Sequence, residues 1–259
     1  MLLPVFSLVF WAFLVGSSLL LFPVGLVLWA MTAPFDRRRR LQHLFTCVWG
    51  SLYTWGNPLW RVRVDGRDRI RPDRTYVMVA NHQSFLDVLV LYRLFTHFKW
   101  VSKAEMFRLP CIGWNMALND YVRLRRGSPE SIAQMMAACE RHLANGSSIM
   151  IFPEGTRSPD GRLHAFKHGA FTLAQQARVP ILPIVMDGTA HALPKHGFVL
   201  HGHHAIRVRV LDEIPVEQVM ALAPEALIAT VHERIARELG QPASDVATTR
   251  PVSQPSLAR

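Results

Sequence analysis

The first 35 residues contain no Asp, Glu, Lys, Arg or His, and four consecutive arginines, Arg37 to Arg40, follow almost at once. A continuous helix of that length would measure about 52 Å at roughly 1.5 Å per residue, whereas the hydrocarbon core of a bilayer is about 30 Å thick. The excess length predicts either a re-entrant hairpin, broken at Gly16 or Pro23, or one tilted span with an interfacial extension. A secretory signal peptide does not fit, because the segment lacks a basic start and is about twice too long.

The next stretch, residues 41–52, carries apolar side chains at the spacing of one stripe along a helix. Five of the seven tryptophans fall within the first 60 residues, as anchors at a membrane interface do. We therefore expect residues 1–59 to form a membrane-associated helical segment. If the chain spans the bilayer once, the four arginines place the remainder on the cytoplasmic side.

Basic charge is concentrated beside this segment. The whole sequence has a formal net charge of +10, and residues 36–74 contain ten arginines against four aspartates. Each basic residue near an anionic membrane surface contributes about 1 kcal/mol of attraction. A surface of anionic lipid headgroups is therefore the partner that we expect. Binding of nucleic acid, which the same charge would suit, is disfavoured because the apolar segment already points to a membrane.

From residue 60 onward, short β-rich runs alternate with helical patterns. We predict strands over residues 61–64, 76–80, 98–102, 121–124, 148–152, 181–186 and 205–211. Helices are expected to begin at Ser84, to run from an N-cap at Ser128 to Asn145, and to cover residues 216–239 with a break near Pro224. This alternation indicates one α/β domain over residues 60–240, and residues 241–259 are expected to form a flexible tail.

Cysteine and histidine are the residue types that raise the question of a metal or a disulfide. The three cysteines, Cys47, Cys111 and Cys139, show no C-x-x-C spacing, so we interpret them as packing residues of a protein from a reducing compartment. The histidines that prompt the alternative of a metal hydrolase are His164, His168, His191, His196, His201, His203 and His204. Because the carboxylates and thiolates typical of a zinc site do not accompany them, we predict no metal site.

The segment N-H-Q-S-F-L-D at residues 81–87 directly follows a predicted strand. A strand-to-helix turn exposes side chains at the end of a sheet, and here it brings a base, His82, near a carboxylate, Asp87. In one continuous helix the two side chains would point about 140° apart, so contact requires His82 in the turn and Asp87 in the first helical turn. The alternative is a structural role, because Ser84 and Asp87 also fit a helix capping box.

A second polar segment, F-P-E-G-T-R-S at residues 152–158, also follows a predicted strand. The planar guanidinium of Arg157 suits bidentate binding of a phosphate, and backbone N–H groups and the Thr156 hydroxyl would add donors. Lys167 lies shortly downstream, where it would add positive charge at the start of a helix. The alternative is a polar surface turn in which Glu154 and Arg157 pair only with each other.

Together these segments resemble the sequence blocks of the glycerolipid acyltransferases. Residues 81–87 are similar to that family's N-H-x4-D block, and residues 152–158 to its F-P-E-G-T-R-S block. Residues 102–123 resemble its K-x-E…P…G…R stretch and residues 179–184 its V-P-I-x-P block. The four blocks stand in the family's order, and by these blocks the chain is most similar to bacterial 1-acyl-sn-glycerol-3-phosphate acyltransferases.

The resemblance implies an α/β fold with a mixed sheet flanked by helices. It also implies transfer of an acyl group from acyl-CoA or acyl-carrier protein to the sn-2 hydroxyl of lysophosphatidic acid, which gives phosphatidic acid. In this reaction His82 would take the proton of the hydroxyl and Asp87 would hold the imidazole, without a cofactor or a covalent acyl-enzyme. Arg157 and Glu154 would orient the acceptor. Further acceptor-binding candidates are Gly155, Thr156, Arg123, Lys103 and Lys167, and structural roles are expected for Asn81, Ser84, Pro153 and Pro180.

Alternatives within and outside the family stay open at this point. Other lysophospholipids and lyso-aminolipids are acceptors of proteins with the same blocks, and His168 departs from a second lysine that many members have. A membrane scaffold without catalysis is a more distant alternative, because it would keep four catalytic blocks without using them. We expect the protein on the cytoplasmic face of a bacterial inner membrane.

Overall fold

A central sheet determines where the polar segments of the chain meet. The computed structural model describes residues 2–195 and 197–242, and within them it contains a seven-stranded sheet in the order β1-β7-β6-β2-β5-β3-β4. Neighbouring strands are parallel except β6 and β7, which are antiparallel. The strands are β1 (Trp60–Asp65), β2 (Val77–Ala80), β3 (Phe98–Lys103), β4 (Val122–Leu124), β5 (Ser148–Ile151), β6 (Ile181–Asp187) and β7 (His204–Val210). The α/β fold with a mixed sheet is confirmed, whereas His196 and most of the predicted tail, residues 243–259, lie outside the described residues.

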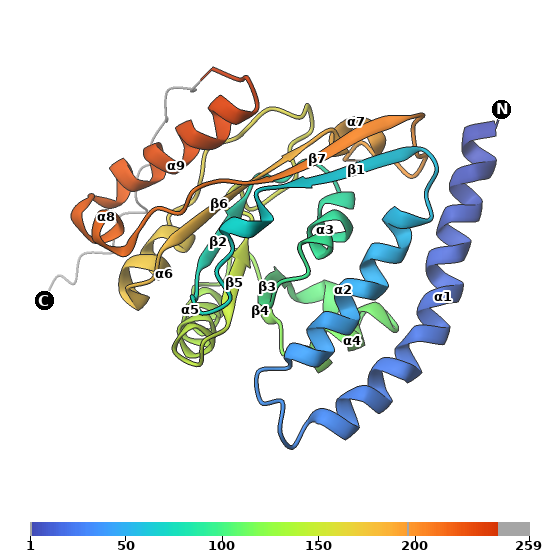
Figure 1. The fold of residues 1–259 in the computed structure, drawn as a ribbon, viewed down its shortest axis with the longest axis horizontal. Coiled ribbons are helices and arrows are strands. Elements are labelled where there is room, and N and C mark those ends of the chain that lie inside the picture. The colour runs from blue at the N-terminus through green and yellow to red at the C-terminus, as the bar shows by residue number, and fades with distance from the viewer. Residues whose placement is uncertain (1, 196, 243–259) are drawn as a thin grey trace, which may run out of the picture.

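Helices cover both faces of the sheet (Figure 1). One face packs against α1 (Leu2–Thr32), α2 (Arg40–Trp55), α3 (Leu86–Leu91) and α4 (Ile112–Leu118), and the other against α5 (Pro129–Ala144), α6 (Gly169–Ala177), α8 (Val216–Ala221) and α9 (Pro224–Glu238). The short helix α7 (Thr189–Ala192) follows β6, and 3-10 turns cover Arg67–Arg69, Tyr92–Leu94 and Ala104–Arg108. Met78 of β2 packs into one core and Val79 into the other, which explains why this strand is apolar without alternation.

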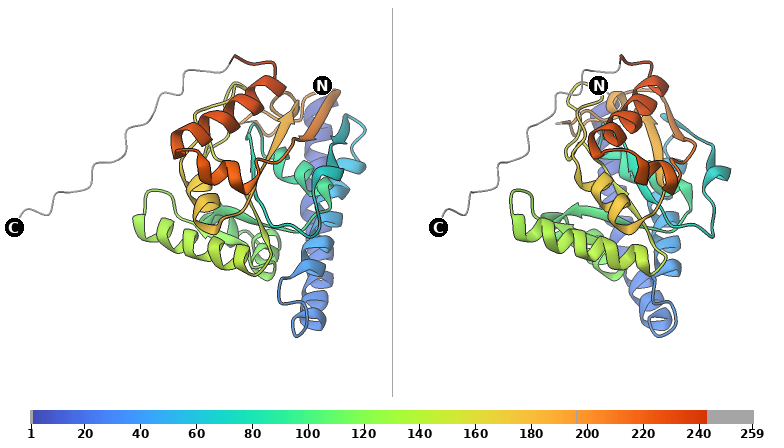
Figure 2. Two further views of the ribbon diagram at one scale, coloured as in Figure 1. Left: turned by 60° about the vertical axis from the view of Figure 1, so that its left-hand side comes forward. Right: turned by 90° about the vertical axis from the view of Figure 1, so that its left-hand side faces the viewer.

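Helix α1 is unbroken, so the re-entrant hairpin expected as one arrangement of the N-terminal segment is not found. The helix runs through Gly16 and Pro23 for 31 residues, and it extends along the whole height of the molecule (Figure 2). Its length is about 46 Å at roughly 1.5 Å per residue. Helix α1 packs against α2 close to Pro23, at Gly25. A Cβ atom at Gly25 would lie 3.0 Å from the Phe45 ring, so this glycine allows the two helices to approach closely.

Hydrogen bonds attach α1 to the rest of the molecule. The Tyr53 hydroxyl of α2 lies 2.9 Å from Ser17 Oγ. Near the start of α1, Trp11 Nε1 donates to the Phe198 carbonyl at 2.7 Å, and Leu200 N donates to Ser7 Oγ at 2.8 Å. The helix is therefore held against the α/β domain at both its start and its middle.

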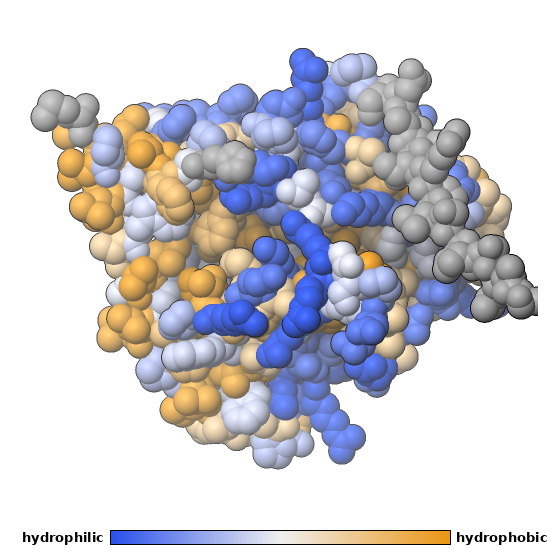
Figure 3. Space-filling view, turned by 180° about the vertical axis from the view of Figure 1, so that it is seen from behind, coloured by the Kyte–Doolittle hydropathy of each residue, from blue (hydrophilic) through white to orange (hydrophobic). Residues whose placement is uncertain are grey.

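The outward side of α1 is apolar and exposed. Its large apolar side chains that are more than half exposed are Leu2, Val5, Leu8, Val9, Phe13, Val15, Leu19, Leu20, Val24, Val27 and Met31. The stripe predicted on α2 divides, because Leu41, Leu44 and Val48 stay exposed whereas Trp49 is buried. Figure 3 shows hydrophobic side chains along the side of the molecule that carries α1. By length and composition, α1 is able to cross a membrane.

Candidate active site

Two polar loops leave the sheet at the same edge. Because β2 and β5 are parallel neighbours with Val79 opposite Ile151, the loops that follow these strands start side by side. Ser158 N in the second loop donates to the His82 carbonyl in the first at 2.7 Å. Asp87 is the second residue of α3, so it lies in the first helical turn while His82 lies in the preceding loop. This is the arrangement that contact between the two side chains requires.

The imidazole of His82 is held by a buried carboxylate. Nδ1 of His82 lies 2.8 Å from Asp87 Oδ2. Because a carboxylate can only accept, we assign the ring proton to Nδ1 and a free lone pair to Nε2. The His82 side chain is 15% exposed and that of Asp87 is fully buried, so the only part of the pair that a ligand can reach is the imidazole. A basic nitrogen presented in this way is suited to take a proton from a bound hydroxyl.

Three further donors surround Asp87. Its Oδ2 accepts from Gln83 N at 2.7 Å and from Ser84 N at 2.9 Å, and its Oδ1 accepts from the Thr189 hydroxyl. Thr189 begins helix α7 just beyond β6, which is parallel to β2 and ends at the same edge of the sheet. The carboxylate therefore has one fixed orientation. Thr189 is a site residue that the sequence motifs do not contain; its position after a strand parallel to β2 is the signal that points to it.

The structural alternative for the first motif is realised only in part, together with the His82–Asp87 contact. Asp87 accepts from Ser84 N, which is one of the two hydrogen bonds of a capping box, but Ser84 Oγ accepts from Leu86 N at 3.3 Å and not from Asp87 N, and α3 begins one residue later than a cap at Ser84 requires. Ser84 is fully buried and donates to the Leu193 carbonyl at 2.6 Å. Its hydroxyl is therefore engaged in the fold and not presented as a nucleophile.

Asn81 and Pro180 contact neighbouring strands of the sheet. The Asn81 side chain donates to the Met186 carbonyl at 2.8 Å and accepts from Met186 N at 2.7 Å, so it extends the pairing of β2 with β6 beyond the end of β2. The Pro180 carbonyl accepts from Val77 N at 3.1 Å at the opposite end of the same pair of strands. Both residues fix the strand from which the first loop leaves.

The Phe152 ring packs against one face of the His82 imidazole. The Phe152 ring stacks on the imidazole with centroids 3.9 Å apart and planes 8° apart, and Trp100 stacks on Phe152 at 5.4 Å. This contact fixes the plane of the imidazole in addition to the hydrogen bond at Nδ1. The sequence presents Phe152 only as the first letter of the second motif and gives no sign of this contact.

Glu154 binds main chain in both loops. Its Oε1 accepts from His82 N at 2.6 Å and its Oε2 accepts from His164 N at 3.1 Å. The surface pair of Glu154 with Arg157, considered as an alternative from the sequence, is wrong because the Glu154 carboxyl is buried and used elsewhere. Burial raises the pKa of Glu154 to about 8, the nearby Asp87 carboxylate adds to the rise, and the two backbone N–H groups oppose it.

The cationic part of the second loop lies around a glycine. Gly155 has φ of 70°, and a Cβ atom there would lie 2.8 Å from Lys167 Nζ, so the ammonium group packs directly on the Gly155 backbone. Lys167 N also donates to the carbonyl of the buried Pro153 at 2.9 Å. Thr156 is exposed, and Arg157 is half-buried with no ion pair among the described residues. Two cationic side chains are thus available in the loop joined to His82.

Two predicted acceptor-binding residues lie farther away. Lys103 forms an exposed pair with Glu105 at 3.8 Å. Arg123 is on the edge strand β4, and its guanidinium lies over the Phe107 ring, 4.7 Å from the centroid. Since β5 and β3 separate β4 from β2, the two strands are about 14 Å apart at roughly 4.8 Å per step. The structure therefore does not bring Arg123 together with the His82–Asp87 pair.

The remaining cysteines and histidines do not assemble a second reactive centre in the described part of the chain. All three cysteines are free and buried, and burial raises the pKa of the Cys47 and Cys139 thiols to about 12. Within residues 2–195 and 197–242, no group of three or more His, Cys, Asp or Glu side chains is placed to hold a metal ion.

Comparison with known proteins shows similarity to acyltransferases. Residues 61–187 match the family model described as Acyltransferase. The chain is 40% identical over 186 residues to a 1-acyl-sn-glycerol-3-phosphate acyltransferase of Chlamydomonas reinhardtii, covering 71% of this chain and 55% of that protein. It is 38% identical over 182 residues to a chloroplastic enzyme of the same name from Arabidopsis thaliana, covering 69% and 49%. The chain therefore spans about half the length of these curated relatives.

A solved structure matches a larger part of the chain. The crystal structure of the 1-acyl-sn-glycerophosphate (LPA) acyltransferase PlsC from Thermotoga maritima has a TM-score of 0.74 and 25% sequence identity. The match covers 91% of this chain and 94% of that one. A match over that share extends well beyond residues 61–187, so the similarity is not limited to the region of the sequence blocks.

Proposed function

We propose that the chain is a member of the acyltransferase family, whose model residues 61–187 match, and that it transfers an acyl group from a thioester to the sn-2 hydroxyl of 1-acyl-glycerol-3-phosphate, giving phosphatidic acid. The observation that carries this proposal is the His82–Asp87 pair, 2.8 Å apart, on a loop joined to the loop of Arg157. A base and a phosphate-binding cation at one edge of the sheet are what a phosphorylated alcohol acceptor needs. Several curated relatives are named 1-acyl-sn-glycerol-3-phosphate acyltransferase, which supports the choice of acceptor.

In the proposed reaction, Nε2 of His82 takes the proton of the acceptor hydroxyl as its oxygen attacks the thioester carbonyl. The carbon–sulfur bond breaks, and the departing thiolate receives the proton from the imidazolium. The negative charge of Asp87, 2.8 Å from Nδ1, stabilises the imidazolium while it exists. General-base catalysis of this kind contributes about 10²–10⁴ in rate. The scheme uses no cofactor and no covalent acyl-enzyme.

Recognition of the acceptor phosphate is assigned to Arg157, with Lys167 beside it. The Arg157 guanidinium offers two parallel donors to a phosphate, and a charge-assisted hydrogen bond contributes about 1.5–3 kcal/mol. The exposed Thr156 hydroxyl is a further donor from the same loop. Glu154, in contrast, is proposed as a positioning residue, because both of its carboxyl oxygens already accept from backbone N–H groups, one of them that of His82.

We also propose that α1 and the exposed stripe of α2 attach the enzyme to a membrane, where a lysolipid acceptor resides. The exposed apolar side of α1 supports this, because large contiguous apolar surfaces on soluble monomers are rare. The segment from Arg37 to Arg40 ends the connection between α1 and α2 and begins α2. These four arginines would therefore meet the lipid headgroups at the end of α1 and α2 where the two helices are connected. The cytoplasmic face of a bacterial inner membrane is the location proposed.

A substrate panel tests the function. The purified full chain in detergent is offered lysophosphatidic acid, lysophosphatidylcholine, lysophosphatidylethanolamine and a lyso-aminolipid, each with acyl-CoA and with acyl-carrier protein, and the products are identified by mass. Phosphatidic acid as the main product is the expected result. Acylation of another lysolipid in preference would correct the acceptor, and no acylation of any of them with either donor would contradict the proposal.

A further inference from the structure

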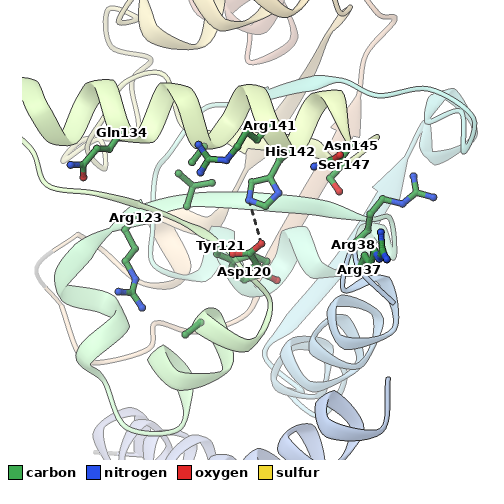
Figure 4. A pocket seen from close by; sticks show the side chains of 13 residues that line it. Arg37, Arg38, Asp120, Tyr121, Arg123, Gln134, Arg141, His142, Asn145 and Ser147 are labelled. Carbon is green, nitrogen blue, oxygen red and sulfur yellow. Dashed lines mark ion pairs between the residues drawn. The ribbon is translucent and has the colours of Figure 1, made fainter. Parts of the chain in front are cut away.

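A large cavity lies outside the catalytic site, at the edge strand β4 of the sheet. It has a volume of about 810 Å³ and lies between α5, the edge strand β4 and the turn that precedes α2 (Figure 4). Because β4 is about 14 Å from β2 at roughly 4.8 Å per strand, this cavity is distinct from the site of His82. Ligand cavities in proteins typically have volumes of about 300–1,000 Å³.

Four arginines line the cavity, namely Arg37, Arg38, Arg123 and Arg141. Figure 4 shows Arg123 on one side, Arg37 and Arg38 on the other, and Arg141 on α5 between them. None of the four forms an ion pair within the part of the chain that the structure describes. Some arginines elsewhere are paired, as Arg74 is with Glu213 and Arg209 with Glu238.

One carboxylate lines the same cavity. Asp120 Oδ2 lies 3.8 Å from His142 Nε2, and burial lowers the pKa of His142 while the Asp120 charge opposes that shift. The lining therefore carries four guanidinium charges against one carboxylate. Neutral hydrogen-bonding groups are contributed by Gln134, Asn145 and Ser147. This composition fits a ligand with more than one negative charge.

Hydrogen bonds fix the turn that carries two of these arginines, and one of them anchors a guanidinium without neutralising it. The two carboxyl oxygens of Asp36 accept from Arg40 N at 2.9 Å and from Leu41 N at 2.8 Å, which fixes the turn that carries Arg37 and Arg38. Arg38 Nη1 donates to the Gly146 carbonyl at 3.3 Å. The turn and Arg38 are thus in place before any ligand arrives, so binding would require little ordering of this side chain.

We propose that this cavity is a binding site for a phosphorylated ligand, recognised through its phosphate groups by Arg38, Arg141 and their neighbours. Guanidinium groups match phosphate oxygens in charge and in bidentate geometry. The same chemistry is found in two sources, the headgroup of an anionic phospholipid and the nucleotide end of an acyl-CoA. The proposal does not rest on the acyl transfer reaction, because binding is measured directly.

Binding of two soluble probes to the full chain in detergent distinguishes these sources. The probes are adenosine 3′,5′-bisphosphate, for the nucleotide, and dihexanoyl phosphatidic acid, for the lipid, each titrated by calorimetry. The test variant combines Arg38→Gln and Arg141→Gln. Its matched control combines Arg61→Gln and Arg71→Gln, two exposed arginines that lack ion pairs among the described residues. A third variant, Arg157→Gln, reports binding in the catalytic site.

We expect at least one probe to bind about tenfold more weakly to the test variant, with binding to the matched control unchanged. Arg157→Gln is expected to weaken only the part of phosphatidic acid binding that occurs in the catalytic site, because phosphatidic acid carries the phosphate assigned to Arg157. The probe that is weakened identifies the source of the phosphate. The proposal is overturned if the test variant binds both probes as the wild type does, or if Arg157→Gln alone abolishes binding of the probe that the test variant binds more weakly. Arg141→Gln alone repeats the test if the double variant does not fold, because Arg141 is exposed.

Discussion

Replacing Asp87 separates the catalytic role of this carboxylate from its structural one. In Asp87→Asn, the amide oxygen can take the place of Oδ2, which accepts from His82 Nδ1, Gln83 N and Ser84 N. The amide NH2 then faces the Thr189 hydroxyl, which can turn and accept. If the amide turned the other way, its NH2 group would face Gln83 N and Ser84 N, and these two buried N–H groups would lack an acceptor at a cost of about 1–3 kcal/mol each. The orientation with the amide oxygen in the place of Oδ2 is therefore favoured. The variant therefore keeps the imidazole tautomer and loses only the negative charge.

The loss of charge sets the expected effect on turnover. A charge-assisted hydrogen bond exceeds a neutral one by about 1–1.5 kcal/mol, which gives a decrease of about tenfold as a lower limit. The Coulomb energy of an imidazolium and a carboxylate about 4 Å apart at an effective dielectric constant of about 20 is roughly 4 kcal/mol, which gives about 10³-fold as an upper limit. We predict that the kcat of Asp87→Asn is lower than that of the wild type by a factor between these limits. Its melting temperature should stay close to that of the wild type.

Asp87→Ala is the companion variant. It leaves Gln83 N and Ser84 N unpaired in the interior, so the protein should lose about 2–6 kcal/mol of stability as well as activity. The assay follows thiol release from acyl-CoA with lysophosphatidic acid in detergent, together with thermal unfolding by tryptophan fluorescence, and Asp160→Asn serves as an exposed-carboxylate control. Near-wild-type turnover of Asp87→Asn would refute the assigned role, and equal melting temperatures of the Asn and Ala variants would refute the hydrogen-bond argument.

Three further predictions concern the second loop. Burial raises the pKa of Glu154 to about 8, whereas the ordinary pKa that it has in the unfolded chain is 4.5. Between these two pH values the folded protein keeps a proton that the unfolded chain has lost, so the free energy of unfolding falls as the pH rises from 4.5 to about 8. Melting temperatures from pH 5 to 8 should fall more steeply for the wild type than for Glu154→Gln, and parallel curves would count against a protonated Glu154. Arg157→Gln should raise the KM for lysophosphatidic acid by about 10- to 100-fold in steady-state assays, and an unchanged KM would remove Arg157 from phosphate binding. Gly155→Ala places a methyl group on a residue with φ of 70°, 2.8 Å from Lys167 Nζ. It should therefore lower the free energy of unfolding by about 1–2 kcal/mol or more, which thermal unfolding detects. An unchanged melting temperature would contradict the close packing.

The strands and the first motif could be predicted from the sequence because local signals determine them. Strands such as β2 and β6 lie between two layers of helices, so they are nearly continuous apolar runs. The contact of His82 with Asp87 follows from a loop and a first helical turn that lie next to each other in the chain. The break between α8 and α9 occurs at Pro224, whose ring cannot continue a helix from within.

Features that depend on tertiary packing could not be predicted in this way. Helix α1 continues through Pro23 and packs on α2 at Gly25, and no local sequence pattern indicates that neighbour. Thr189 and Phe152 join the site through strands β6 and β5, far from residues 81–87 in the sequence. Arg123 is close to the other motifs along the chain but lies on the edge strand, because strand order and not sequence order decides which residues meet.

The central claim is that His82 acts as the general base of acyl transfer to lysophosphatidic acid. The most direct test compares His82→Ala with His203→Ala, an exposed histidine outside the pair, by measuring phosphatidic acid formed from acyl-CoA and lysophosphatidic acid by mass. The account predicts that His82→Ala lowers turnover by about 10²-fold or more while His203→Ala leaves it unchanged and both proteins stay folded. Turnover of folded His82→Ala close to that of the wild type would contradict it.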